Sequence, residues 1–272
     1  MVLALTAVRP IVEAARFPGT TALPRAASGP GRYCRGMGSP VSTESSDGVT
    51  TIVMDDGKAN AFSFDMFDAL NSALDQAEAD GDVVLLAGRP GRFSGGFDLG
   101  VLTAFTGDSA RLLRTGFELS HRLLSFPRPV VIAVTGHAYA MGAFLVLSAD
   151  YRLGVAGSDH RITANEVSIG MALPHAALEV CCQRLARSHF ERATGLAEVY
   201  SPDAAIEAGW LDEVVAEPEL LDTARARATA FAALDAGAHR VTKLRSRSAM
   251  LESLAAAIER DDAEFLEAIA AR

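Results

Sequence analysis

The chain has 272 residues and a formal net charge of −9, which argues against a nucleic-acid partner bound through a basic face. Hydrophobic residues make up 49% of the sequence and charged residues 22%, so the chain can build a large core and is not of the disordered class. Its three cysteines include no C-x-x-C pair, and we therefore expect reduced thiols and a cytoplasmic protein.

Residues 1–46 differ in composition from the rest of the chain. Arginines recur in them, acids are few, and Gly, Pro, Ala and Ser are frequent. An arginine-rich, acid-poor leader is typical of an organelle transit peptide, which would place the protein in an organelle matrix. The simpler interpretation is a disordered extension, or a true start at Met37, and we prefer it. The predicted fold therefore excludes residues 1–46.

From residue 47 onward, apolar runs alternate with segments of helical periodicity. Strands are predicted at 49–54, 83–87, 130–134, 151–155 and 160–163, with a short last one within 211–215. Helices are predicted at about 64–80, 109–126 and 142–147, and the chain is mostly helical from residue 174 onward. Ser63 and Ser201 are the expected N-caps of the helices that follow them. This pattern predicts an α/β core over 47–215 and a helical C-terminal part over 216–272.

The segment 129–149 carries no formal charge and is long enough to span a bilayer. However, Thr135, Gly136 and His137 interrupt it, its first part is rich in β-branched residues, and its last part has helical periodicity. A buried strand, turn and helix explain these features better, and we expect no membrane insertion.

Two glycine-bearing turns, each after an apolar strand, are the most informative feature of the sequence. The first turn covers 92–99 and contains Gly95-Gly96-Phe97, and the second covers 136–142 and ends in Met141-Gly142. Glycine lets a backbone approach a ligand closely. Two free backbone N–H groups that converge on one carbonyl oxygen form an oxyanion hole, and we interpret the turns as its two halves.

Several other chemistries lack their signatures. The glycines of 29–38 do not follow a strand, so there is no dinucleotide fingerprint, and no H-E-x-x-H or Walker sequence occurs. The segment 91–95 misses the G-x-S-x-G spacing by one residue. We expect no metal site and no separate cofactor. His137 and His175 lie near interesting turns, but we expect them to be hydrogen-bonded core or rim residues.

The order and spacing of five motifs resemble those of the crotonase (enoyl-CoA hydratase/isomerase) superfamily. The matching stretches are Lys58-Ala59-Asn60-Ala61, 93–99, 136–150, 165–170 and 204–215. Each motif alone is weak, whereas all five in order are hard to obtain by chance. The resemblance covers roughly residues 48 to 270 and implies a ββα spiral core, with C-terminal helices that form a trimerisation part. It also implies a homotrimer or a dimer of trimers, with an acyl-CoA thioester as substrate and coenzyme A as part of that substrate.

Carried over position by position, the resemblance assigns roles to individual residues. The backbone N–H groups of Phe97 and Met141 would bind the thioester oxygen, with Met141 at the N-terminus of a helix. The substrate and its CoA moiety would contact Lys58, Ala59, Ala61, Gly95, Gly96, Asp98, Leu99, Gly142 and Phe144. Lys243 and Arg245 could meet CoA phosphates, although solvated helix charges are the simpler interpretation.

The resemblance also bears on the reaction. Family hydratases use two glutamates to hold and activate a water molecule. The first would stand where this chain has Phe144, which cannot move a proton. The second aligns with Glu166, and the resemblance therefore indicates the branch with a single catalytic glutamate. One carboxylate suffices for a 1,3-proton shift, in which it takes a proton from C2 of a 3-enoyl thioester and returns it to C4.

The residues after Glu166 are mostly apolar, and such surroundings would raise the pKa of a carboxyl group towards neutrality, as a general base requires. The alternative is that Glu166 caps the following helix or lies in solvent. Glu179 is a second acid that could face the pocket, although a solvated or paired helix acid is the simpler interpretation. Asp98 is expected to cap the segment after its turn.

We therefore predict an enoyl-CoA isomerase of fatty-acid β-oxidation that converts Δ3 into Δ2 enoyl-CoA. The first alternative is an enoyl-CoA hydratase, which would need a second acid or a water near Phe144. A non-catalytic acyl-CoA carrier is an alternative from another class, and thioester hydrolysis or decarboxylation on the same scaffold also stays open.

Overall fold

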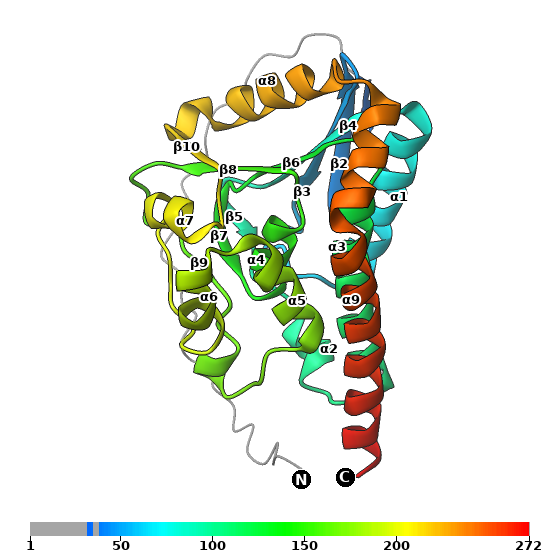
Figure 1. The fold of residues 1–272 in the computed structure, drawn as a ribbon, viewed down its shortest axis with the longest axis vertical. Coiled ribbons are helices and arrows are strands. Elements are labelled where there is room, and N and C mark those ends of the chain that lie inside the picture. Colours follow the sequence, from blue (N-terminus) through cyan, green and yellow to red (C-terminus); the bar gives the residue numbers. More distant parts are fainter. Residues whose placement is uncertain (1–31, 35–37, 272) are drawn as a thin grey trace. The chain divides into compact units, whose positions relative to one another are not determined.

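The computed structural model describes residues 32–34 and 38–271, and within this part the chain forms two β-sheets with helices around them (Figure 1). The larger sheet has seven strands in the order β1-β2-β3-β4-β6-β8-β10. Their bounds are β1 Arg32–Cys34, β2 Val41–Ser46, β3 Val49–Met54, β4 Val83–Gly88, β6 Val130–Ala133, β8 Tyr151–Val155 and β10 Glu213–Val215. The pairs from β3 to β10 are parallel, whereas β1, β2 and β3 pair antiparallel.

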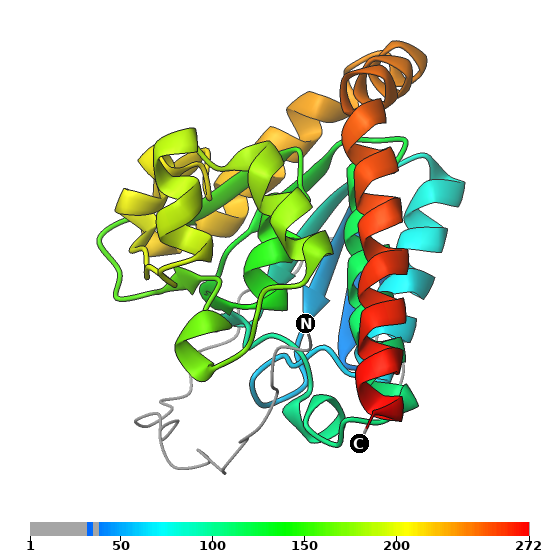
Figure 2. The ribbon, with the colours of Figure 1, turned by 60° about the horizontal axis from the view of Figure 1, so that its bottom comes forward.

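Helices follow most strands and then dominate the C-terminal half. They are α1 Phe64–Asp80, α2 Leu99–Leu102, α3 Gly107–Ser125, α4 Met141–Leu147, α5 His175–Arg184, α6 Arg187–Thr194, α7 Pro202–Ala208, α8 Leu220–Ala232 and α9 Ala236–Ala270, with 3₁₀ turns at Val167–Ile169 and Glu217–Glu219. In Figure 2, α8 lies on one side of the large sheet and α1 on the other, and α9 runs alongside α3.

The side chains of the central strands alternate between the two faces of the large sheet, which explains why helices cover both faces. Leu85 and Val131 belong to the apolar cluster that contains Leu220 and Ala224 of α8. Their neighbours in sequence, such as Leu86, belong to the main core with α1 and α3. Successive side chains of a strand point to opposite faces, so a parallel sheet covered on both faces needs near-continuous apolar runs.

The fold begins earlier than the sequence predicted. Residues 41–46 were expected to lie outside the fold, yet β2 pairs with β3 along its whole length, and β1 pairs with β2. The sequence of β2 is too polar to predict a strand by itself. It can be polar because β2 lies next to the edge strand of the sheet, and only Val41 in it is fully buried. Residues 1–31 and 35–37 lie outside the described part of the chain.

Most other predicted elements are confirmed. Ser63 caps α1 by accepting a hydrogen bond from the N–H of Met66, and Ser201 caps α7. The uncharged run 129–149 forms β6, β7 (Gly136–Tyr139) and the fully buried α4. Among the described residues, no helix combines the length and the apolar character needed to cross a membrane.

The smaller sheet was largely missed from the sequence. It has the order β5-β7-β9, with β5 at Gly91–Ser94 and β9 at Ile162–Thr163, and its strands are parallel. These strands have two to four residues and two of them begin with glycine, so they carry too little periodicity to be recognised.

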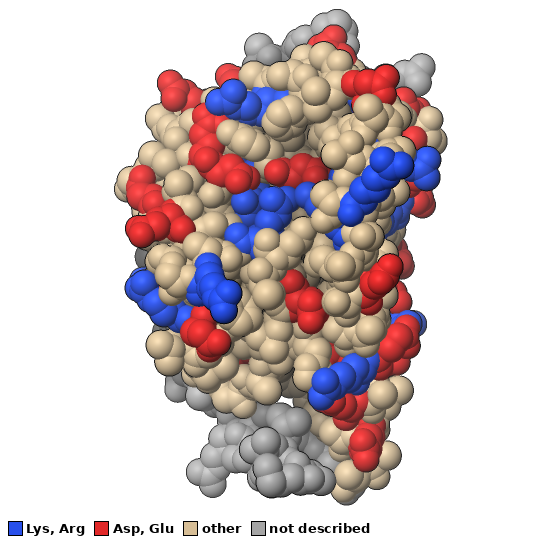
Figure 3. Space-filling model, in the orientation of Figure 1, with Lys and Arg blue, Asp and Glu red and all other residues tan. Residues whose placement is uncertain are grey.

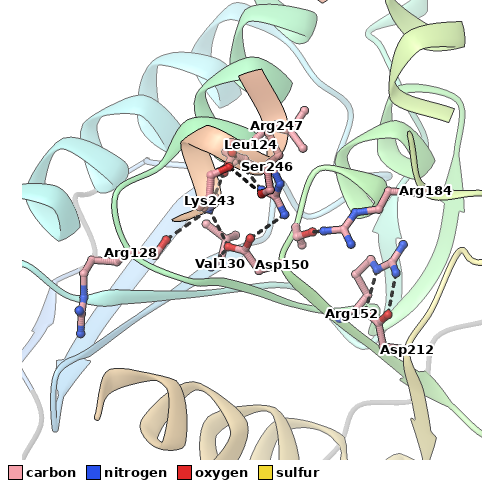
Figure 4. Close-up of polar contacts among 12 residues, drawn as sticks. Leu124, Arg128, Val130, Asp150, Arg152, Arg184, Asp212, Lys243, Ser246 and Arg247 are labelled. Carbon is pink, nitrogen blue, oxygen red and sulfur yellow. Dashed lines mark hydrogen bonds and ion pairs between the residues drawn. The ribbon is translucent and has the colours of Figure 1, made fainter. Parts of the chain in front are cut away.

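A buried ion cluster joins α9 to the N-terminal ends of strands β6 and β8 (Figure 4). Lys243 is only 5% exposed, and its Nζ donates to Asp150 Oδ2 at 2.6 Å. Arg247 contacts the other oxygen of Asp150 at 2.8 Å, and the N–H of Val130 donates to the same carboxylate at 2.7 Å. The expectation that Lys243 is a solvated helix charge is therefore wrong, because its side chain pairs inside the protein. Elsewhere on the face drawn in Figure 3, basic and acidic side chains are interspersed.

Asp150→Asn should lower the free energy of unfolding by about 3 kcal/mol, because it leaves two buried cations without a counter-charge. Asp222→Asn, an exposed aspartate of α8, is the matched control and should change stability by less than about 0.5 kcal/mol. Chemical denaturation measured for both variants checks this, and equal stabilities would contradict it.

Candidate active site

The small parallel sheet brings three candidate segments together. β5 leads into Gly95-Gly96-Phe97, β7 leads into Ala140-Met141, and β9 leads into Asn165-Glu166. The N–H of Ala140 donates to the carbonyl of Thr163 at 3.0 Å, which extends the pairing of β7 with β9. Because the carboxyl ends of parallel strands meet at the same edge, both glycine turns and Glu166 lie at one edge of this sheet.

The two glycine turns touch through their backbones. Gly96 has φ +92°, and a Cβ atom placed on it would lie 3.1 Å from the carbonyl oxygen of Tyr139 and 3.6 Å from the nitrogen of Met141. Only glycine combines this conformation with such an approach. In the described part of the chain, neither the N–H of Phe97 nor that of Met141 donates a hydrogen bond. Two unused donors therefore stand on adjoining turns.

Backbone strain marks the second turn. Ala140 has φ +50° and ψ −122°, a conformation that L-residues seldom adopt, and α4 begins at the next residue. The N–H of a first helical residue has no partner inside its helix, so the turn leaves the N–H of Met141 available. Gly142 allows α4 to pack on β5, since a Cβ atom there would lie 2.9 Å from the carbonyl oxygen of Ser94.

The loop 58–61 is fixed against the first turn by Asn60. Its buried amide donates to the carbonyls of Met54 and Phe93, at 2.9 and 3.2 Å. The N–H of Gly95 in turn donates to the carbonyl of Ala59 at 2.8 Å. Lys58 itself is exposed, and Ala59 and Ala61 are half-buried, so the loop forms a rim beside the turn.

Asp98 and Leu99 lie at the outer end of the first turn. Asp98 accepts a hydrogen bond from the N–H of Gly100 at 2.8 Å and is the N-cap of α2, as predicted. Leu99 is 61% exposed, so its side chain lies at the surface rather than in the interior.

Three aromatic side chains pack in a row in the interior beside the glycine turns. The ring of Phe97 lies 6.3 Å from that of Phe117, which lies 5.9 Å from that of Phe144. All three are buried, and Phe144 is 1% exposed. The position at which a hydratase would carry its first glutamate is therefore filled by a packed phenyl ring.

Glu166 is a buried acid that forms no ion pair with any residue the structure describes. Its side chain is 6% exposed, and its Oε2 atom has no hydrogen-bond partner among the described residues. Burial raises its pKa to about 7, partly opposed by its own backbone N–H. It stands at the N-cap position of the 3₁₀ turn that follows, but its side chain makes no capping hydrogen bond. Both simpler expectations for Glu166, a helix cap or a solvated acid, are therefore wrong.

The other titratable candidates are less buried than Glu166, although burial lowers the pKa of His137. Glu179 is half-buried on α5. His137 accepts a hydrogen bond from the N–H of Arg161 at 3.1 Å, and the ring of His175 lies 3.5 Å from the Glu264 carboxylate. No cluster of His, Cys, Asp and Glu in the described chain has the arrangement of a metal site.

Gly116 is a site residue that the sequence analysis missed. A Cβ atom on Gly116 would lie 2.5 Å from Cε1 of Phe97 and 3.2 Å from Sδ of Met141, the two residues with the free N–H groups. A glycine in the middle of a helix is unfavourable and commonly has a packing reason, which is the signal that could have identified it.

Comparison with known proteins places the chain in a family. The family model for enoyl-CoA hydratase/isomerase matches residues 44–271. The mitochondrial enoyl-CoA delta isomerase 1 of Homo sapiens is 29% identical over 267 residues, which cover 94% of this chain and 87% of that protein. A solved structure named enoyl-CoA isomerase from Mycobacterium tuberculosis is 45% identical, with a TM-score of 0.80 and coverage of 83% of this chain and 99% of that one.

A solved structure from Mycobacterium marinum, named an enoyl-CoA hydratase, is equally similar, with 45% identity, a TM-score of 0.80 and coverage of 83% and 99%. The fold and the family match define an α/β crotonase-type enzyme. The chain belongs to the enoyl-CoA hydratase/isomerase family.

Gly116→Ala should lower kcat/KM on enoyl-CoA thioesters by about 10- to 100-fold, because the added methyl group displaces Phe97 and hence its N–H. Gly107→Ala, at the start of the same helix, is the matched control, since a Cβ atom there meets nothing within 4 Å. Steady-state kinetics of both variants check this. Equal activity of the two would show that the placement of Phe97 does not matter.

Proposed function

We propose that the chain is a Δ3–Δ2 enoyl-CoA isomerase with Glu166 as its single catalytic acid and base. In this reaction the thioester oxygen accepts hydrogen bonds from the N–H groups of Phe97 and Met141. The Glu166 carboxylate removes a proton from C2, and the C3–C4 π electrons of the resulting dienolate become available to accept a proton at C4. Glu166 returns the same proton there, and the double bond moves to C2–C3 without net gain or loss of atoms.

The observation that carries this proposal is the unpartnered, buried carboxyl oxygen of Glu166. A base with a pKa near 7 is present in useful amounts in both protonation states at neutral pH, as a group that must accept and then donate a proton requires. The unused oxygen provides a site for the proton.

The aromatic row supports the isomerase over the hydratase. Hydration needs a water molecule held between two acids, whereas Phe144 packs on Phe117 and offers no polar atom. Relatives of equal similarity carry both names, so the assignment rests on these residues of the chain.

We also propose the substrate contacts and the assembly. Lys58, Ala59 and Ala61 would follow the CoA moiety, and Gly95, Gly96, Gly142 and Phe144 would line the thioester and acyl part, with Asp98 and Leu99 at the outer end. Homotrimers or dimers of trimers, with residues 216–272 as the trimerisation part, remain a proposal. We propose a cytoplasmic or organelle location from the cysteine usage and from the composition of residues 1–46. The role in fatty-acid β-oxidation is proposed from the family resemblance.

Glu166→Gln should lower kcat for isomerisation of a 3-enoyl-CoA by about 10³-fold while acyl-CoA binding persists, because only proton transfer is lost. Glu179→Gln is the matched control and should keep its activity. Steady-state assays together with calorimetric acyl-CoA titrations test both variants.

Two outcomes would favour the alternatives. Fast hydration of a 2-enoyl-CoA that survives Glu166→Gln would reject the isomerase mechanism. Tight acyl-CoA binding without turnover in the wild type would favour a non-catalytic carrier.

The pH dependence of kcat should show an acid limb near pH 7. Only the deprotonated Glu166 can remove the C2 proton, so kcat should fall about tenfold per pH unit below its pKa of about 7 and level off above it. A profile of kcat from pH 5 to 9 measures this limb. A plateau that extends down to pH 5 would contradict the assignment of Glu166 as the base.

A further inference from the structure

The N-terminus of α5 is capped by a residue from the far end of the chain. The N–H groups of His175 and Ala176 donate to Oδ1 and Oδ2 of Asp261, at 2.8 and 2.9 Å. Asp261 belongs to α9 and is 9% exposed. The local N-cap is Pro174, whose side chain has no acceptor atom, so α5 depends on Asp261 for the hydrogen bonds that a cap provides.

This cap holds the end of the segment that carries Glu166. The carbonyl of Glu166 accepts hydrogen bonds from the N–H groups of Ile169 and Met171, at 3.0 and 2.9 Å, which fix the first half of the segment. Residues 167–170 are exposed, so packing adds little there, whereas Met171 and Leu173 lie partly buried against the main core. The next fixed backbone donors are those of His175 and Ala176 on Asp261. The path of residues 167–174 is thus set at one end by Glu166 itself, at the other by α9, and between them by the partial packing of Met171 and Leu173 on the main core.

The same part of α9 is joined to the helix behind the glycine turns. Arg114 of α3 pairs with Glu259 and with Asp262, the latter at 3.3 Å. Two residues further along α3, Gly116 lies against the ring of Phe97. The long helix α9 contacts both α3 and α5 (Figure 2). Its C-terminal half therefore bridges the helix that packs on Phe97 and the helix that follows the segment of Glu166.

We propose that Asp261 is a positioning residue for Glu166, which acts by anchoring the N-terminus of α5 and with it the segment 167–174. This inference rests on the proposed role of Glu166 as the base. The titratable groups next to Asp261 are His175 and Glu264, and Cys181 on α5 is the titratable group near Glu166. Loss of the anchor lets the segment loosen and water reach the Glu166 carboxyl, which changes both its position and its solvation.

Asp261→Ala should lower kcat about tenfold, and the acid limb of the kcat profile should move from about pH 7 towards the ordinary glutamate pKa of 4.5. Asp261→Asn keeps one acceptor oxygen and should shift the limb in the same direction by less. Asp262→Asn, the next residue of α9, is the matched control, because its partner is Arg114 rather than α5. It should keep the wild-type limb.

The acid limb of the kcat profile distinguishes a role in positioning Glu166 from a role in stability alone. A loss of folded protein lowers the activity but leaves the pH of this limb unchanged. Unchanged kcat and an unchanged limb in folded Asp261→Ala would overturn the proposal, and if that variant does not fold, an unchanged limb in Asp261→Asn would do so. Failure of the proposed function gives a different result, namely isomerisation that survives Glu166→Gln.

Discussion

The contact between the backbone of Gly96 and that of Tyr139-Ala140-Met141 is the constraint on which the site depends. It joins two chain segments that are more than forty residues apart, and it requires a glycine with positive φ on one side and a strained alanine on the other. The small parallel sheet supplies the surroundings that hold both, because β5 and β7 pair immediately before the turns. Two backbone donors are thereby fixed before a ligand arrives, and preorganised donors stabilise developing charge most effectively.

The burial of Glu166 makes the stability of the protein depend on pH. Raising the pKa of Glu166 from 4.5 to about 7 corresponds to about 3 kcal/mol of stability. Because the folded state binds this proton more tightly than the unfolded state, the contribution is fully present below about pH 4.5 and is lost as pH rises to about 7. The protein is therefore least stabilised by this group under the conditions in which Glu166 can act as a base. Such a compromise is typical of functional sites.

The sequence predicted the parts of the site that are local. Both glycine turns, the cap at Asp98 and the acid at Glu166 lie in short motifs, and the long apolar strands and α1 follow from periodicity alone. What it missed depends on distant partners. Gly116 matters because of Phe97, and β2 is a strand because β3 lies beside it. Glu166 could be recognised as an acid in an apolar run, but its missing hydrogen-bond partner is a property of the assembled interior.

Phe144 has two physical consequences that act together. Its side chain provides no acidic group, and through Phe117 and Phe97 it continues an apolar wall up to the residue that carries one of the free N–H groups. An apolar wall raises the energy of an ionised carboxyl group nearby and strengthens hydrogen bonds from fixed donors, because both effects grow as water is excluded. In the proposed isomerase, a site of this kind would favour moving a proton between two carbons over adding a water molecule. The choice between the two reactions then follows from solvation as much as from the number of acids.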